Sequence, residues 1–370
     1  MSRHIPTYWD YLDLEKLLST QKGLEEHESH LMPDELHFIV IHQTLELWLK
    51  LIMSELRLAR DHLDALKVPE EDIPHVVHHM KRMIEILKLC TNQFDVVETL
   101  TPRDFLGFRD KLFPASGFQS YQMREMEVLL GMEEKDRISL GGVSTMDYLK
   151  SLAQDSKGGQ NAWATIEKAQ KEVPLKEALH KWLYRCPIHG SRPSDKGDDK
   201  VVEAFLEDYL AAWRENAASQ LDKMASAKLA PLSGLQRRFE ESLKGIAAFL
   251  QAKDIEVKEQ RQKTRRLRAA AVFVESYREL PLLAWPRLLL DTVVELEERL
   301  VLFRQRHARM AERIIGRRVG TGGSDGVDYL DATSKSRIFK DLWTVRTVLL
   351  SKDALPPIIN PDFYNFVSKN

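Results

Sequence analysis

Residues 38–63 read FIVIHQTLELWLKLIMSELRLARDHL, and their apolar side chains recur with the period of an α-helix. Spacings of three and four residues place side chains on one face of a helix, and this stretch keeps them for about seven turns. The repeating positions are Phe38, Ile41, Leu45, Trp48, Ile52, Leu56, Ala59 and Leu63. Glu46 and Lys50 lie four residues apart, in the order that favours a helical ion pair. We therefore expect a long amphipathic helix that buries one face in a core.

Similar patterns recur at about residues 74–100, 201–224, 233–250 and 286–316, whereas strand signals are scarce. The sequence predicts an all-α fold, with one large, bundle-like helical domain spanning residues 1–370. Residues 131–144 and 186–200 interrupt the helical pattern. The second stretch, CPIHGSRPSDKGDDK, is rich in proline, glycine and charge, and we expect an exposed loop there. We assign both to a loop-rich helical insertion at about residues 133–200.

The composition is that of an ordinary globular protein, with 43% hydrophobic and 30% charged residues. The 54 basic and 56 acidic side chains give a net charge of −2, which argues against a general nucleic-acid binder. No segment approaches the ~20 apolar residues that span a bilayer. The amino end, MSRHIPTYWDYLDLEKLL, lacks the apolar core of a signal peptide. Two cysteines suit a reducing compartment, so we predict a cytoplasmic protein without membrane or nucleic-acid partners.

Two histidines lie within apolar stripes of the expected long helices. One stripe comprises Leu289, Val293, Leu296, Leu300, Phe303, His307, Met310 and Ile314. His42 shares the face of Phe38 and Leu45 in the early helix. A buried imidazole needs a partner, which is either a backbone carbonyl or a cofactor. Haem suits an apolar cavity between helices with one axial histidine, whereas catalytic zinc needs three ligands and the chain has no HExxH pattern.

A glycine-rich stretch, RVGTGGSDGVDYL, follows the last long helix at residues 318–330. A phosphate-binding loop would lie between a strand and a helix and would carry a Gly-Lys-Ser/Thr sequence, and neither condition is met. By itself the stretch therefore indicates a helix cap and a turn.

Four sequence blocks resemble the tryptophan 2,3-dioxygenase family. They are TYWDYLDL from Thr7, FIVIHQTLELWLKLI from Phe38, ETLTPRDFLGFRDKLFPASGFQS from Glu98, and RHARMAERIIGRRVGTGGSDGVDYL from Arg306. The resemblance implies a mostly helical homotetramer, a dimer of dimers, with a haem pocket between its long helices. It also implies an oxidoreductase that inserts O2 into the indole C2–C3 bond of L-tryptophan to give N-formylkynurenine.

The same resemblance implies roles for individual residues. His307 matches the proximal haem ligand, and His42 matches the distal histidine that faces the indole nitrogen. Arg109 matches the arginine that binds the substrate carboxylate. Thr321 matches a threonine near the ammonium and carboxylate groups of the substrate, in a loop that we expect to act as a lid.

Further matches complete the expected pocket. Phe38 matches an aromatic wall and Ser116 a distal-side hydroxyl. Tyr8 and Tyr11 match tyrosines that reach into the pocket of a neighbouring subunit. Position 105 is Phe, as in animal-type members, where bacterial members commonly have a substrate-binding tyrosine.

The haem is expected to be haem b and to bind non-covalently, because no cysteine stands four residues after His307. Two alternatives stay open, and the first of them is suggested by residues 133–200, which do not match the family pattern. One is a haem monooxygenase of the same superfamily that acts on a substituted tryptophan or another aromatic amino acid. The other is a non-catalytic haem-binding helical protein.

Overall fold

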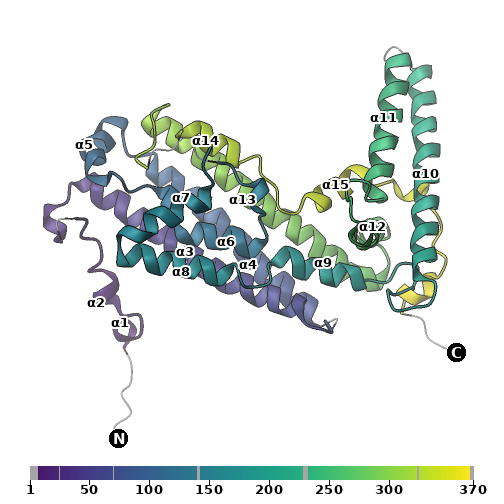
Figure 1. The fold of residues 1–370 in the computed structure, drawn as a ribbon, viewed down its shortest axis with the longest axis horizontal. Helices are drawn as coiled ribbons and strands as arrows, with labels where there is room; N and C mark the ends of the chain where they lie inside the picture. The colour runs from purple at the N-terminus through teal and green to yellow at the C-terminus, as the bar shows by residue number, and fades with distance from the viewer. Residues whose placement is uncertain are drawn as a thin grey trace, which may run out of the picture. The chain divides into compact units, whose positions relative to one another are not determined.

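The structure is a computed structural model that describes residues 7–24, 26–69, 71–139, 142–227, 232–322 and 325–366. Helices account for 73% of it, and the only β pairing in these ranges is an isolated bridge between Ile188 and Ser191. The predicted all-α fold is confirmed (Figure 1).

The described α-helices include all five that the apolar periodicity predicts, with ends shifted by a few residues. The long ones are α3 (Pro33–Asp64), α4 (Asp72–Val97), α10 (Asp198–Ser226), α11 (Leu232–Leu250) and α13 (Ala284–Ile315). The shorter ones are α1 (Tyr8–Tyr11), α2 (Leu14–Leu17), α5 (Pro102–Leu112), α6 (Tyr121–Leu130), α7 (Thr145–Leu152), α8 (Lys157–Ala169), α9 (Leu175–Arg185), α12 (Lys258–Ser276), α14 (Val327–Thr333) and α15 (Lys340–Val348).

Contacts group the chain into two compact units. Unit 1 comprises residues 1–55, 82–172 and 298–336, and unit 2 comprises residues 56–81, 173–297 and 337–370. Helices α3, α4 and α13 therefore contribute residues to both units. A single domain over residues 1–370 stays a prediction.

Unit 1 holds the larger, amino-terminal part of α3 and the carboxyl-terminal parts of α4 and α13, together with α5 to α8 and α14. Helix α8 packs against α6 and α7 (Figure 1). Part of the expected insertion at 133–200 is therefore a packed part of this unit. Its core includes Ile41, Leu49, Phe94, Phe108, Met126 and Ile166, all of them buried.

From the sequence we expect no segment that is apolar enough to span a bilayer, and helix α3 differs from this expectation. By length and composition alone, it is the one helix of the described chain that meets the requirements for a membrane span. The core helices of water-soluble proteins pass the same test. Ile41 and Leu49 of this helix are buried in unit 1, which is the behaviour of a core helix.

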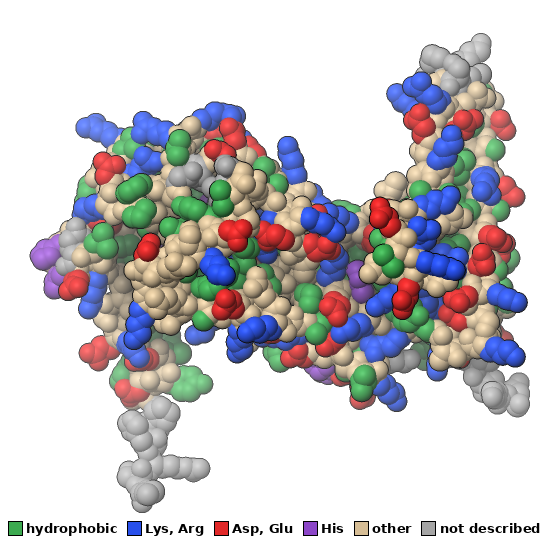
Figure 2. Space-filling view, viewed as in Figure 1, with side chains coloured by type: hydrophobic (Ala, Val, Ile, Leu, Met, Phe, Trp, Pro, Cys, Tyr) green, Lys and Arg blue, Asp and Glu red, His purple; other side chains and the backbone are tan. Residues whose placement is uncertain are grey.

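Unit 2 contains α9 to α12 and α15, and its core is rich in aromatic side chains. Phe205, Phe273, Tyr277 and Tyr364 are buried there, with His189 among them. The expectation of an exposed loop at 186–200 is wrong in part, because Ile188 and His189 lie in this core. Helices α10 and α11 pack along one another, and their surface mixes basic and acidic side chains (Figure 2).

Candidate functional site

One cavity of unit 1 is lined by residues from α3, α4, α5, α6, α13 and α14 and from the segments that follow α5 and α13. All the predicted pocket residues except Tyr8 and Tyr11 border it, namely Phe38, His42, Phe105, Arg109, Ser116, His307 and Thr321. Residues predicted from separate sequence blocks thus meet at one place.

His307 reaches the cavity from α13, whose predicted apolar stripe is buried on both sides of it. The imidazole lies parallel to the ring of Phe94, with centroids 5.4 Å apart and an interplanar angle of 6°. Burial, followed by the nearby His42, lowers the pKa of His307 to about 4. The imidazole is therefore neutral at physiological pH, and a neutral imidazole nitrogen can bind a metal ion.

His42 has a defined tautomer. Its Nδ1 lies 2.8 Å from the carbonyl oxygen of Phe38, one turn earlier in α3. A carbonyl can only accept, so Nδ1 carries the proton and donates it. Burial lowers the pKa of His42, which keeps the ring neutral and leaves Nε2 as an acceptor.

Three phenylalanines form an aromatic wall beside His42. The Phe38 ring lies 3.9 Å from the imidazole, centroid to centroid. It also contacts Phe105 and Phe108 at 6.0 and 5.8 Å. Phe105 and Phe108 are buried on α5, so this side of the cavity offers an apolar, ring-lined surface to a ligand.

Arg109 also projects from α5 and is held in place at one end only. Its Nη2 donates to the carbonyl of Val319 at 2.7 Å, whereas its buried Nε has no hydrogen-bond partner in the described chain. An ion pair with Glu98 would be the simplest structural role. However, Glu98 pairs with Arg306 and Arg313, and Arg109 has no ion pair with any acid that the structure describes. A guanidinium with an unused buried N–H suits an anionic ligand.

The glycine-rich stretch also borders this cavity through Gly320 and Thr321, and we call residues 316–322 the glycine loop. Thr321 Oγ1 donates to the carbonyl of Ala115 at 2.7 Å. A Cβ added to Gly322 would stand 2.8 Å from the Cβ of Ser116, so only glycine permits this approach. The loop and the segment after α5 therefore form one continuous edge of the cavity.

Comparison with known proteins agrees with this picture. A family model described as tryptophan 2,3-dioxygenase matches residues 1–349. The chain is 44% identical to tryptophan 2,3-dioxygenase 2 of Ralstonia nicotianae, over 98% of each protein. It is 43% identical to tryptophan 2,3-dioxygenase of Sorangium cellulosum, over 97% of this chain and 87% of that protein. A tryptophan 2,3-dioxygenase-like protein of Xanthomonas campestris pv. campestris is 48% identical over 72% of this chain and 98% of its own length.

The chain belongs to the tryptophan 2,3-dioxygenase family. This is a family of oxidoreductases and is haem-dependent. The family's haem dependence fits a cavity that pairs a neutral histidine with an apolar lining.

Tyr8 and Tyr11 lie apart from the cavity, on α1. Their side chains are 71% and 79% exposed. The neighbouring Trp9 is 63% exposed, so the segment presents three large aromatic rings to its surroundings. Their predicted role in a neighbouring subunit stays a prediction.

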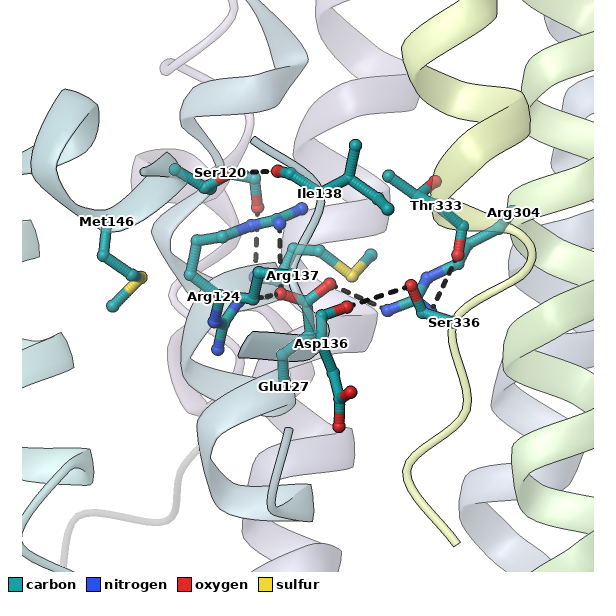
Figure 3. Close-up of polar contacts among 12 residues, drawn as sticks. Ser120, Arg124, Glu127, Asp136, Arg137, Ile138, Met146, Arg304, Thr333 and Ser336 are labelled. Atoms are coloured by element: carbon teal, nitrogen blue, oxygen red, sulfur yellow. Dashed lines mark hydrogen bonds and ion pairs between the residues drawn. The ribbon is translucent and has the colours of Figure 1, made fainter. Parts of the chain in front are cut away.

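A buried carboxylate on the cavity wall is absent from the residues that the sequence singles out. Glu127 of α6 accepts from Arg124, Arg137 and Arg304 at 3.0, 2.6 and 2.8 Å, and Figure 3 shows the three guanidiniums converging on it. Burial opposes its ionisation, but the three positive charges outweigh burial and hold the pKa of Glu127 below its ordinary range. Arg304 comes from α13, three residues before His307, so this cluster links α6 to α13, and both helices line the cavity.

The guanidiniums of the Glu127 cluster are not all fully used. Three guanidiniums share one buried carboxylate, and the buried Nε of Arg124 has no hydrogen-bond partner within the described ranges. Arg124 and Arg304 both border the cavity. The only signal in the sequence is an acid in the otherwise apolar run from Met126 to Leu130, because its partners lie far away along the chain.

Proposed function

We propose that this protein is a haem-dependent dioxygenase that inserts O2 into the indole C2–C3 bond of L-tryptophan and yields N-formylkynurenine. The observation that carries the proposal is the meeting of His42, Arg109 and His307 at one cavity in a chain of this family. His307 supplies a metal-binding imidazole, His42 supplies an acceptor for an N–H group, and Arg109 supplies a donor for a carboxylate.

The residues around the cavity fit haem b, bound without a covalent link. His307 would ligate the iron as a neutral imidazole, with Phe94 and Phe303 packed against it. The unused buried N–H groups of Arg109 and Arg124 suit carboxylates, which both haem and an amino acid carry. When bound, haem iron would supply the activation of dioxygen.

The protein's own residues would orient the substrate. Nε2 of His42 would accept the indole N–H, because Nδ1 is already committed to Phe38. Arg109 would bind the carboxylate and Thr321 the zwitterionic end. Phe38 and Phe105 would exclude water beside the indole ring, and Ser116 would add a hydroxyl on the distal side.

We also propose a cytoplasmic homotetramer, a dimer of dimers, with Tyr8 and Tyr11 completing the pocket of a neighbouring subunit. Exposed apolar side chains on α3 support association. Val40, Leu47 and Leu51 follow a helical spacing of seven and four residues and are 43%, 50% and 37% exposed. An apolar stripe of this kind on a helix indicates an interaction surface.

Product mass tests the proposal directly. The ferrous enzyme is incubated with tryptophan and oxygen, and an expected gain of two oxygen atoms identifies a dioxygenase. A gain of one oxygen would instead indicate a monooxygenase of the same superfamily. An absorption spectrum without a haem band in protein expressed with sufficient haem would contradict the cofactor.

A further inference from the structure

We infer that Tyr148 is a positioning residue that holds the glycine loop against the cavity, and so sets the place of Thr321 over the substrate. Tyr148 lies on α7, within residues 133–200, which the four sequence blocks leave out but which the family model spans. Its hydroxyl donates to the carbonyl of Gly322 at 2.7 Å. Gly322 directly follows Thr321, so this bond fixes the backbone next to the threonine.

The phenol ring itself is held from the cavity side. Phe118 borders the cavity, and its ring lies 5.6 Å from the ring of Tyr148. On another side Phe118 packs against Tyr329 of α14, also at 5.6 Å. Because Tyr148 is half-buried in this row of rings, its hydroxyl has few alternative positions.

Helix α7 is in turn fastened to the Glu127 cluster. Ser144 caps α7 by accepting from the N–H groups of Met146 and Asp147, and its own hydroxyl donates to Glu134 at 2.6 Å. Glu134 pairs with Arg137 at 3.1 Å, and Arg137 binds the buried Glu127. The start of α7, which carries Tyr148, is therefore linked through Glu134 and Arg137 to the buried carboxylate of Glu127. Figure 3 shows Arg137 beside Glu127.

Helix α7 has a further anchor at its start, where Thr145 donates to the carbonyl of Ile138 at 2.8 Å. Met146 and Leu149 are buried on the same helix, so α7 has a core-facing side as well as polar anchors. A helix tied at its start and packed along its length can act as a fixed support for a loop.

Three hydrogen bonds then hold residues 319–322 of the loop. Arg109 donates to Val319, Thr321 donates to Ala115, and Tyr148 donates to Gly322. The first two use residues that we assign to the substrate, so substrate binding would exchange them for ligand contacts. Tyr148 is the one of the three donors without a proposed ligand, and its bond can persist when the substrate is bound.

The substrate part of this inference rests on the proposed function, whereas the loop part does not. Tyr148→Phe keeps the ring packing and removes only the donor. One hydrogen bond contributes about 0.5–1.5 kcal/mol net, which corresponds to about a two- to twelvefold change. We therefore expect amide hydrogen exchange of residues 317–322 in the ligand-free enzyme to accelerate by that factor. KM for tryptophan should rise similarly, with kcat close to the wild-type value.

A matched control is Tyr277→Phe in unit 2. Its hydroxyl also donates to a backbone carbonyl, that of Pro356, at 2.8 Å. This variant should change neither loop exchange nor KM. Gly322→Ala supplies a reference for a displaced loop, because the new Cβ would collide with Ser116.

Loop exchange in Tyr148→Phe equal to that of the wild type would overturn the inference. So would faster exchange with KM unchanged, because the bond would then hold the loop without positioning the substrate. Absence of tryptophan turnover by the wild type would contradict the proposed function instead, and the exchange measurement would still decide whether Tyr148 holds the loop.

Discussion

Each unit packs a histidine against aromatic rings, but the two histidines differ in what else they contact. His189 of unit 2 lies 5.4 and 5.3 Å from the rings of Phe205 and Phe273, and its Nδ1 accepts the N–H of Ile359 at 3.3 Å. His307 of unit 1 packs against Phe94 and borders a cavity, and no hydrogen bond to its ring is found in the described ranges. The first has the protein as its partner, whereas the second is free to bind a ligand.

Arg268 of unit 2 and Arg109 of unit 1 differ in the same way, in whether the protein itself supplies all their partners. Arg268 of unit 2 donates to Asp254 and Asp341 and to the carbonyl of Phe249, so all its nitrogens are used. Arg109 of unit 1 makes one bond to a loop carbonyl and keeps a buried N–H unused. Buried polar groups in a core are normally satisfied, so an unsatisfied group beside a cavity indicates ligand binding.

Replacing His307 and replacing His189 should have opposite effects on haem content. His307→Ala should abolish stable haem binding, because the proposed iron ligand is lost. His189→Ala should keep the haem and only lower the melting temperature, and His42→Ala should keep the haem but lose turnover. Haem content from the absorption spectrum and melting temperature measure these effects. Full haem content in His307→Ala would overturn the comparison.

A second test compares how each unit neutralises a buried charge. Glu127→Gln should cost about 3–5 kcal/mol of the free energy of unfolding, because three buried guanidiniums lose the anion that they share. Asp254→Asn should cost about 1 kcal/mol or less, because Asp254 is 55% exposed and Arg268 keeps Asp341. Urea unfolding of both variants measures the difference. Equal costs would mean that the three guanidiniums do not depend on the charge of Glu127.

Arg109→Lys sharpens the comparison at the level of substrate binding. Lysine keeps the charge but cannot reproduce a two-pronged contact with a carboxylate, so tryptophan affinity should fall by about 1.5–3 kcal/mol, or ten- to a hundredfold. Arg268→Lys should leave this affinity unchanged. The wild type should also prefer tryptophan to tryptamine, which lacks the carboxylate. Titration of both ligands with each protein checks this, and no preference in the wild type would remove Arg109 from the site.

The sequence predicts the parts of the site that depend on local periodicity. The stripes on α3 and α13 identify His42 and His307, and the family resemblance adds Arg109. Glu127 and Tyr148 escape prediction, because Arg304 lies 177 residues from Glu127 and Gly322 lies 174 residues from Tyr148. Helical periodicity reports which face is buried, but it does not report which distant side chain meets that face.

The last prediction concerns Glu275 of α12, a carboxylate of unit 2 whose side chain is only 8% exposed. Burial, followed by the charge of Asp291, raises the pKa of Glu275 from 4.5 to about 7, although Arg346, Arg287 and Arg278 oppose the rise. Its nearest cation is Arg346, 3.9 Å away, and Arg346 binds Asp291 more closely at 2.8 Å.

The folded pKa of Glu275 therefore lies above the unfolded value, so the unfolded chain releases this proton at lower pH. Stability should fall as pH rises from 4.5 to about 7, with the loss complete above that. Glu275→Gln removes the charge, so it should raise the free energy of unfolding by about 1–2 kcal/mol at pH 8, after allowance for partial solvent exposure. Near pH 4.5 the variant and the wild type should be equally stable. Urea unfolding at both pH values tests this, and a destabilised variant at pH 8 would show that Arg346 stabilises the ionised Glu275 after all.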